Sequence, residues 1–234
     1  MTSGTGPPLP EAPRLRVAFR TFGCKLNLYE STGMSQAVRE RSYEIVSAPH
    51  DADIVVVNTC SVTMRADQEA RQFIRRVHRT RPGTRLVVTG CYAQRAPEEL
   101  RGLPGVALVA GHAEKDVLDR LLDELPPPGG GPRVAVGPLG GKRMTRLRAT
   151  GVEGRTRALL RVQDGCDSAC TYCVIPRTRG PSRSLTLEEA IDEGRRLLDA
   201  GYREIVVTGT HLGHYGLDLG ATPRLSELVE RLVA

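Results

Sequence analysis

The stretch Asp53–Cys60, DIVVVNTC, contains four consecutive apolar residues and ends in a cysteine. A short β-branched run of this kind, bounded by polar residues, is typical of a buried strand. A second run, RLVVT at Arg85–Thr89, follows after the amphipathic segment Met64–Thr80, whose spacing favours a helix. Because strand, helix and strand in succession form the repeating unit of a parallel sheet, the sequence predicts an α/β fold.

The same alternation extends along the chain in both directions. Further strands are expected at Arg14–Thr21 and Val106–Val109, and further helices at Tyr29–Arg41, Pro97–Gly102 and Ala113–Leu125. A sheet built in this way is covered by helices on both faces. We therefore expect an N-terminal parallel-sheet α/β domain over residues 14–125.

The residues before this domain, 1–13, are rich in Pro, Gly, Ser and Thr. They lack the basic flank and apolar centre of a signal peptide, and we expect a disordered tail. No stretch approaches the ~18 consecutive apolar residues of a membrane span. These features predict a cytoplasmic protein with no membrane partner, in which the six cysteines indicate metal or redox chemistry rather than disulfides.

The run PPPGGGPR at Pro126–Arg133 is predicted neither to continue a helix nor to pair in a sheet. We expect a linker over residues 126–156 and a second domain over residues 157–234. The α/β alternation resumes there, with strands at Ala158–Gln163 and Glu204–Thr208 and helices at Thr186–Ala200 and Pro223–Val233. A complete barrel takes about 250 residues, so this domain is expected to be the incomplete start of one.

The second half of the linker and the residues after it are strongly basic. Between residues 142 and 161 the chain carries one acid, Glu153, and seven cations: Lys142, Arg143, Arg146, Arg148, Arg155, Arg157 and Arg161. One interpretation is a solvated connector, since charged runs usually face water. The other is a strap that contacts the phosphate groups of a nucleic acid. The net charge of +6 on 234 residues is modest, so charge alone leaves both interpretations open.

Three cysteines, Cys24, Cys60 and Cys91, each lie just past the end of a predicted strand, in the contexts TFGC, VVNTC and VVTGC. In an open parallel sheet, ligands bind outside the carboxyl ends of the strands, so these side chains can converge. The alternative is three independent buried cysteines, since a free cysteine packs as a small apolar residue. Their equivalent positions in successive strand–helix units favour a common site.

The other three cysteines lie close together in DGCDSACTYC, Asp164–Cys173, with C-x3-C-x2-C spacing: Cys166, Cys170 and Cys173. This spacing also fits one face of a helix. The intervening residues, however, offer no apolar face, and Gly165 and Pro176 flank the segment. A loop wrapped around a ligand is therefore favoured.

The donor set bears on which metal the cysteines would hold. A structural zinc needs four protein ligands, and neither cysteine group supplies a fourth. His211 and His214 lie beyond the next strand, and single histidines are more often core or surface residues than ligands. Three thiolates suit a 4Fe-4S cluster whose remaining iron is free to bind a substrate.

The C-x3-C-x2-C loop with an aromatic residue, Tyr172, before its last cysteine resembles the radical S-adenosylmethionine (SAM) enzymes. Within them, the chain from Leu15 onward resembles the methylthiotransferase family in these segments: TFGCKLNLYES (21–31), VNTCSVT (57–63), VTGCYAQ (88–94), RVQDGCDSACTYCVIPRTRG (161–180) and VTGTHLGHYGLD (207–218). Lys25 after Cys24 is most similar to the branch that modifies threonylcarbamoyladenosine in tRNA. Branches that modify isopentenyladenosine in tRNA or a ribosomal protein typically carry Gln or Pro there.

This resemblance implies an enzyme with two 4Fe-4S clusters that uses SAM. The radical SAM cluster would be held by Cys166, Cys170 and Cys173, and an auxiliary cluster by Cys24, Cys60 and Cys91. The reaction implied is the addition of a methylthio group to ring carbon 2 of N6-threonylcarbamoyladenosine next to the tRNA anticodon. Ring carbon 2 is too inert for acid–base attack, so radical chemistry supplied by the cofactor is required.

The resemblance also implies further contacts and partners. Tyr172 would lie near the SAM adenine, and Thr208 and Gly209 near its methionyl part. Arg146 and Arg148 would contact phosphate groups of a tRNA anticodon stem-loop. A low-potential electron donor would reduce the radical SAM cluster.

Alternative functions use the same residues. Within the family, the substrate could be isopentenyladenosine in tRNA or a ribosomal protein. In a different class, the cysteines could hold metal in a non-catalytic RNA-binding module. Family members also continue through a six-unit partial barrel and a C-terminal RNA-binding β-domain. We therefore expect this chain to be truncated and inactive by itself.

Overall fold

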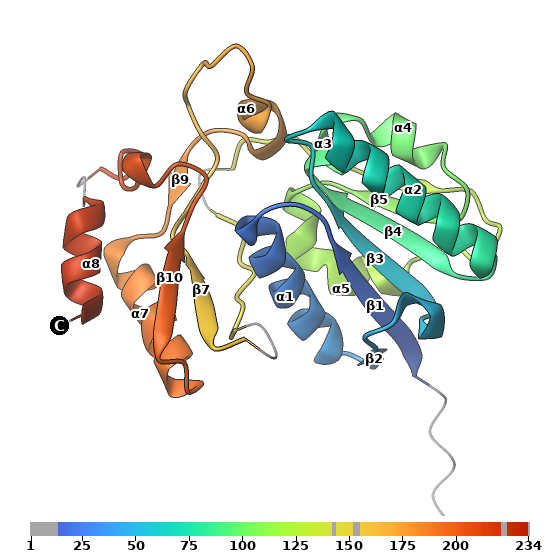
Figure 1. Cartoon of the computed structure of the whole chain (residues 1–234), viewed down its shortest axis with the longest axis horizontal. Coiled ribbons are helices and arrows are strands. Elements are labelled where there is room, and N and C mark those ends of the chain that lie inside the picture. Colours follow the sequence, from blue (N-terminus) through green and yellow to red (C-terminus); the bar gives the residue numbers. More distant parts are fainter. Residues whose placement is uncertain (1–13, 142–143, 152–154, 221–223, 234) are drawn as a thin grey trace, which may run out of the picture.

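The computed structural model describes residues 14–141, 144–151, 155–220 and 224–233. The predicted tail at 1–13 lies outside these residues, as do Lys142, Arg143 and Glu153 of the basic segment. The described chain forms a six-stranded parallel sheet with helices on both faces, followed by a smaller α/β unit (Figure 1). The predicted α/β class is confirmed.

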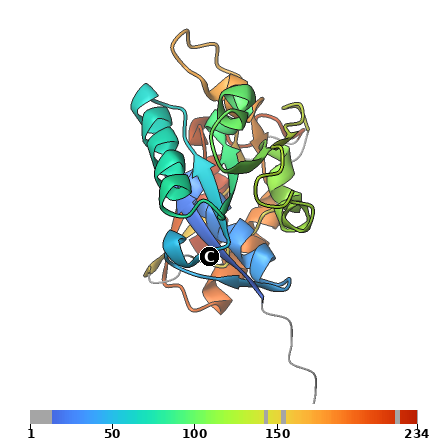
Figure 2. The ribbon, with the colours of Figure 1, turned by 90° about the vertical axis from the view of Figure 1, so that its right-hand side faces the viewer.

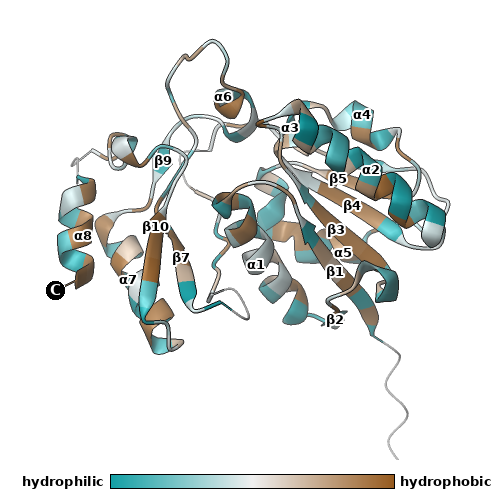
Figure 3. Ribbon diagram, in the orientation of Figure 1, coloured by the Kyte–Doolittle hydropathy of each residue, from teal (hydrophilic) through white to brown (hydrophobic). Residues whose placement is uncertain are grey.

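The first domain is built on a sheet with the strand order β2-β1-β3-β4-β5-β6. Its strands are β1 (Leu15–Thr21), β2 (Tyr43–Ile45), β3 (Ile54–Thr59), β4 (Arg85–Gly90), β5 (Val106–Ala110) and β6 (Arg133–Ala135). The buried central strands β3 and β4 are mostly brown in Figure 3. The chain runs from β1 to β2 on one side and then to β3 on the other. Ligands bind at the carboxyl ends of strands where the order reverses in this way.

Helices cover both faces of this sheet, as Figure 2 shows for α2 and α5. One face carries α1 (Lys25–Arg39) and α5 (Leu118–Asp123), and the other α2 (Met64–Thr80) and α4 (Pro97–Arg101). Along β3, Ile54 and Val56 pack toward α1, whereas Val55 and Val57 pack toward α2, because successive side chains of a strand point to opposite faces. The remaining short helices are α3 (Cys91–Arg95), η1 (Pro49–Asp51) and η2 (Ala113–Val117).

Helix α1 begins at Lys25, earlier than the predicted start at Tyr29. Its first turns contain the buried polar residues Asn27 and Glu30, which interrupt the apolar period by which a helix is predicted. The side-chain amide of Asn27 donates to the carbonyl oxygens of Phe22 and Thr59 at 2.8 and 2.9 Å. Because these partners come from elsewhere in the fold, the start of α1 could not be read from local pattern.

The predicted linker is not a free connector. Arg133–Ala135 forms β6 and pairs in parallel with β5, so the prediction that Pro126–Arg133 cannot pair in a sheet is wrong at its last residue. Further on, the strap, defined here as residues 144–151, lies against the first domain. Its residues Leu147 and Ala149 are buried, and the Tyr29 hydroxyl donates to the Leu147 carbonyl at 3.2 Å.

The second domain pairs β7 (Arg157–Arg161) with β10 (Glu204–Thr208) in parallel, and α7 (Leu187–Asp199) covers them. A capping box formed by Thr186 and Glu189 begins α7. Its other elements are β8 (Gln163–Asp164), α6 (Ile175–Arg179), β9 (Arg183–Ser184), η3 (Leu212–His214) and α8 (Leu225–Val233). Among the described residues, no helix has the length and apolar character needed to cross a membrane.

Candidate functional site

The structure brings Cys24, Cys60 and Cys91 together at the carboxyl edge of the sheet. Cys24 immediately precedes α1, Cys60 follows β3 and Cys91 begins α3. All three line one cavity of about 330 Å³. Two of them flank the reversal of strand order between β1 and β3, where the topology favours a ligand.

Two glycines allow the cysteines to approach one another. Gly23 has φ +100°, and a Cβ atom there would lie 2.5 Å from Cys60 Cβ. Gly90, with φ +99°, would place a Cβ atom 2.2 Å from the Thr59 carbonyl oxygen. Any side chain at either position would push the strand ends apart, because non-bonded atoms are never this close.

The chemistry of this donor set fits a metal cluster. The three thiols are free rather than paired in disulfides. Burial raises the pKa of Cys60, with smaller contributions from the neighbouring cysteines. A buried thiol of this kind gives up its proton readily only when a metal binds, since the cation then compensates the thiolate charge. Soft thiolate ligands select iron–sulfur clusters, zinc or copper(I).

The opposite wall of the cavity comes from the second domain. It is formed by Ile175 and Arg179 of α6 and by the segment Thr208–Thr210 that follows β10. Thr208 and Gly209, chosen from the sequence as SAM contacts, therefore share a cavity with the cysteines of the first domain. Tyr172, the other such residue, does not line this cavity and is 90% exposed.

Arg179 joins the two domains beneath the cavity. Its Nη1 atom donates to Glu30 Oε1 and to Asp164 Oδ1, both at 2.9 Å, and its Nη2 atom donates to Asn27 Oδ1 at 2.7 Å. Lys115 Nζ also donates to Glu30, at 2.6 Å. The charged groups of this network are almost completely buried. Burial alone would raise the pKa of Glu30, but the charges of Arg179 and Lys115 hold it well below its usual value.

His112 lies beside this network. Its Nδ1 atom is 3.9 Å from Glu30 Oε1, and its Nε2 atom has no hydrogen-bond partner among the described residues. Burial, and then the charges of Lys115 and Arg179, lower the pKa of His112 well below its usual value, although Glu30 opposes the shift. The imidazole is therefore neutral in the folded protein.

This neutrality predicts a pH-dependent stability. Below pH ~6.5 the unfolded chain takes up a proton on His112, whereas the folded protein does not. The free energy of unfolding should therefore decrease as the pH is lowered, by up to ~1.4 kcal/mol per pH unit. Glu30 should add a further loss below pH ~4.5, because its carboxylate takes up a proton only on unfolding. Urea denaturation of the metal-free protein measures this. His112→Gln should flatten the curve between pH ~6.5 and ~5, and an unchanged curve would contradict the assignment.

The second cysteine group occupies a loop between β8 and α6. Residues 165–170 adopt no helix. The predicted loop is therefore confirmed, and the alternative of an amphipathic helix is excluded. The Cys166 amide donates to the Gly180 carbonyl at 3.0 Å, and the Cys173 amide to the Cys170 carbonyl at 3.0 Å. Cys170 is exposed, whereas Cys166 and Cys173 are half-buried. The loop therefore presents thiols at the surface, where a cluster and a small molecule have access.

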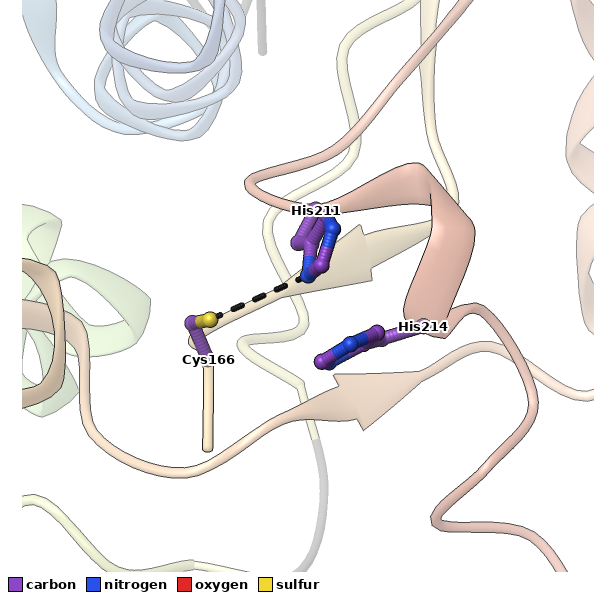
Figure 4. Close-up of side chains that lie close together, drawn as sticks. All are labelled: Cys166, His211 and His214. Carbon is purple, nitrogen blue, oxygen red and sulfur yellow. Dashed lines mark hydrogen bonds between the residues drawn. The ribbon is translucent and has the colours of Figure 1, made fainter. Parts of the chain in front are cut away.

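The structure places His211 and His214 beside the second cysteine group. From the sequence, both are expected to be core or surface residues rather than ligands, yet the Nδ1 atom of His211 lies 4.0 Å from Cys166 Sγ (Figure 4). One ligand atom from each of Cys166, His211 and His214 lies within 4.8 Å of the others. The turn after β10 brings the histidines back over the loop, because parallel strands β7 and β10 end at the same edge.

Residue pattern did not identify Asn27, Glu30 or Arg179 as functional. Asn27 and Glu30 are on the buried side of α1, and Arg179 is buried in α6. The only local signal was the presence of charged or amide side chains where a buried helix face needs apolar ones. Their partners are more than a hundred residues apart, so the pairing itself has no local signal.

Two regions of the chain match protein families. Residues 16–111 match the family described as "Uncharacterized protein family UPF0004", and residues 160–232 match the "Radical SAM superfamily". The first region contains the cysteines of the sheet edge, and the second contains those of the loop.

Curated relatives extend through both regions. The chain is 41% identical over 207 residues to the threonylcarbamoyladenosine tRNA methylthiotransferase MtaB of Bacillus subtilis, over 87% of this chain and 45% of that protein. It is 32% identical over 228 residues to the ribosomal protein uS12 methylthiotransferase RimO of Lachnoclostridium phytofermentans, over 94% of this chain and 50% of that protein. The chain thus spans about half the length of the curated relatives it matches.

A solved structure shares the fold. The radical S-adenosylmethionine methyltransferase TsrM of Kitasatospora setae superposes with a TM-score of 0.56 at 16% identity, over 94% of this chain and 50% of that one. At this identity the likeness concerns the fold alone. It supports the predicted arrangement of an α/β domain followed by radical SAM strands and helices.

Proposed function

This chain belongs to the radical SAM methylthiotransferase family, and on that premise we propose that it acts in adding a methylthio group to ring carbon 2 of N6-threonylcarbamoyladenosine in tRNA. One observation carries the proposal. The cavity that holds Cys24, Cys60 and Cys91 is also lined by Arg179 and Thr208–Thr210 of the radical SAM region. A substrate base in this cavity would therefore be in reach of both regions at once.

The chain's own residues have distinct roles in this proposal. The loop cysteines would hold one 4Fe-4S cluster and the sheet-edge cysteines a second: Cys166, Cys170 and Cys173, and Cys24, Cys60 and Cys91. When bound, the first cluster and SAM supply a one-electron reductive cleavage that yields a hydrogen-abstracting radical. Thr208 and Gly209 would bind the methionyl part of SAM and Tyr172 would lie near its adenine, and a low-potential donor would reduce the cluster. We place this reaction in the cytoplasm, where tRNA is modified.

The strap provides one proposed contact with the RNA. Its buried residues Leu147 and Ala149 alternate with the exposed residues Arg146 and Arg148. Backbone amides of the strap donate to Asp116 at 2.9 and 3.2 Å, which fixes its position. Arg148 Nε lies 3.9 Å from Glu193, but the side chain is 61% exposed. Both guanidinium groups are thus available for phosphate oxygens.

Analysis of nucleosides from cells that lack this protein tests the proposal. We expect the 2-methylthio derivative of threonylcarbamoyladenosine to disappear, and to return when the intact gene is restored. The 41% identity to a threonylcarbamoyladenosine enzyme, against 32% to a ribosomal-protein enzyme, supports this substrate. Loss of the isopentenyladenosine derivative, or of the uS12 modification, would instead identify one of the other substrates.

A second candidate function is a non-catalytic metal-containing RNA-binding module. The closeness of Cys166, His211 and His214 favours it, since a thiolate and two imidazoles suit zinc. Metal analysis of protein purified without oxygen separates the two. About eight irons per chain would support two clusters, whereas about one zinc with little iron would support the module.

A further inference from the structure

A basic groove lies along α2, on the face of the sheet opposite the strap. The α2 groove, as we define it, is lined by Arg20, Phe22, Phe73, Arg75, Arg76 and Arg79 and has a volume of about 500 Å³. A smaller hollow of about 230 Å³ adjoins it, shares Phe73 and Arg76, and ends at Arg81. Much of the α2 ribbon is teal in Figure 3, because the helix is rich in hydrophilic residues.

The cations of the groove have no carboxylate partners in the part of the chain that the structure describes. Among the described residues, none of the four guanidinium groups of Arg20, Arg75, Arg76 and Arg79 forms an ion pair with a carboxylate. The one acid that lines the groove, Glu69, is bound by Arg65 at 2.9 Å. Four guanidinium groups around one hollow form a concentrated positive site for an anionic partner, because a cleft lined by one sign of charge focuses its field and arginine pairs well with phosphate or carboxylate.

Aromatic rings form the floor of the groove. The Arg20 guanidinium lies over the rings of Phe22 and Phe73, 5.2 and 5.7 Å from their centroids, and that of Arg76 lies 5.6 Å from Phe73. These contacts hold the arginines in place while leaving their N–H groups without carboxylate partners. Arginines combined with aromatic rings are typical of surfaces that bind RNA, where phosphates pair with guanidinium groups and bases stack on rings.

The spacing and position of the groove suit a polynucleotide that also reaches the cavity. Arg75 and Arg79 are one helical turn apart, about 6 Å along the axis, so they can contact successive phosphates. Phe22 lies at the end of β1, two residues before Cys24. The groove therefore starts at the same edge of the sheet as the cysteine cavity and leads away from it along α2.

We propose that the α2 groove binds the sugar–phosphate backbone of the RNA substrate. This inference rests on the proposed function and adds a second RNA contact, on the opposite face of the first domain from the strap. Contacts between guanidinium groups and phosphates carry no sequence information, so they contribute affinity and orientation rather than sequence preference.

Binding of a labelled anticodon stem-loop at several salt concentrations tests the inference. The double variant Arg75→Gln/Arg79→Gln should bind roughly tenfold more weakly at 0.1 M salt and lower the slope of log affinity against log salt by about 1.4, at about 0.7 per lost contact. Arg75→Lys/Arg79→Lys keeps the charge and should retain the wild-type slope. Arg203→Gln/Arg231→Gln removes the same charge from exposed positions of the second domain and should change neither quantity.

The outcomes separate this inference from the function on which it rests. If Arg75→Gln/Arg79→Gln showed the same salt dependence of binding as the Arg203→Gln/Arg231→Gln control, the proposed RNA contact of the groove would be wrong. This would hold even where tRNA is still methylthiolated. A lower slope for Arg75→Gln/Arg79→Gln would support RNA binding by the groove, whether or not a methylthiolated nucleoside forms. Absence of that nucleoside would contradict the proposed reaction but not the RNA contact. Arg146→Gln/Arg148→Gln, measured in parallel, reports on the strap independently.

Discussion

Replacing Arg179 by methionine should lower the free energy of unfolding by about 3–5 kcal/mol, the usual cost of removing one partner from a buried ion pair. The side chain is 1% exposed and donates to Glu30 and Asp164. Without it, Asp164 keeps neutral donors, the Gly165 amide at 2.9 Å and the Thr210 hydroxyl at 3.1 Å. The cations that remain near it among the described residues, Arg161 and Arg183, are more distant, at 3.9 and 3.7 Å. Burial by itself would lower the pKa of Arg179, but Glu30 and Asp164 raise it well above its usual value. The Arg179 guanidinium group is therefore charged in the folded protein, and its replacement removes a buried positive charge.

Urea denaturation of the metal-free protein measures this effect without interference from cluster loss. Arg177→Met is the matched control, since Arg177 is exposed in the same short helix and its replacement should be nearly neutral. Equal stability of the two variants would show that the network contributes little. Glu30→Gln and the double variant complete a cycle in which the two residues should not be additive, because they are in contact.

Replacing Cys60 by alanine should remove one of the two proposed clusters. Cys60 is 5% exposed and lines the cavity beside Cys24 and Cys91, and two thiolates do not hold a cubane cluster as three do. Protein reconstituted without oxygen should then contain about four irons per chain instead of about eight. Iron and sulfide analysis measures this loss.

Cys166→Ala is the corresponding control in the other cysteine group. It should lose a similar amount of iron, because its cysteine belongs to the loop of the radical SAM region, which is proposed to hold the other cluster. If Cys60→Ala kept all of its iron, the sheet-edge cysteines would not hold a cluster. The three would then be packed thiols, the alternative that sequence left open.

Much of the first domain follows from local pattern. Helix α2 begins at Met64 and ends at Thr80 as expected, and strand β10 spans the predicted residues Glu204–Thr208. These elements have a strong apolar period of their own, so their neighbours do not alter their limits. The strand-end positions of Cys24, Cys60 and Cys91 follow in the same way, because the carboxyl ends of parallel strands lie at one edge.

Other features depended on contacts that no local pattern contains. The start of α1 rests on Asn27, whose amide donates to backbone carbonyls at the ends of β1 and β3. Strand β6 follows a run of prolines and glycines and exists because β5 offers it a free edge. His211 reaches Cys166 only because β7 and β10 are paired in register.

By itself, the sequence determined the α/β class, the limits of the strongly periodic elements and two groups of three cysteines. The tertiary structure alone decided that Cys24, Cys60 and Cys91 share a cavity with Thr208 and Gly209, and that Arg179 joins Glu30 to Asp164 beneath it. The physical reason is the range of the forces involved. Apolar period and turn chemistry act over a few neighbouring residues, whereas a buried charge is stabilised by whichever partners the completed fold places around it.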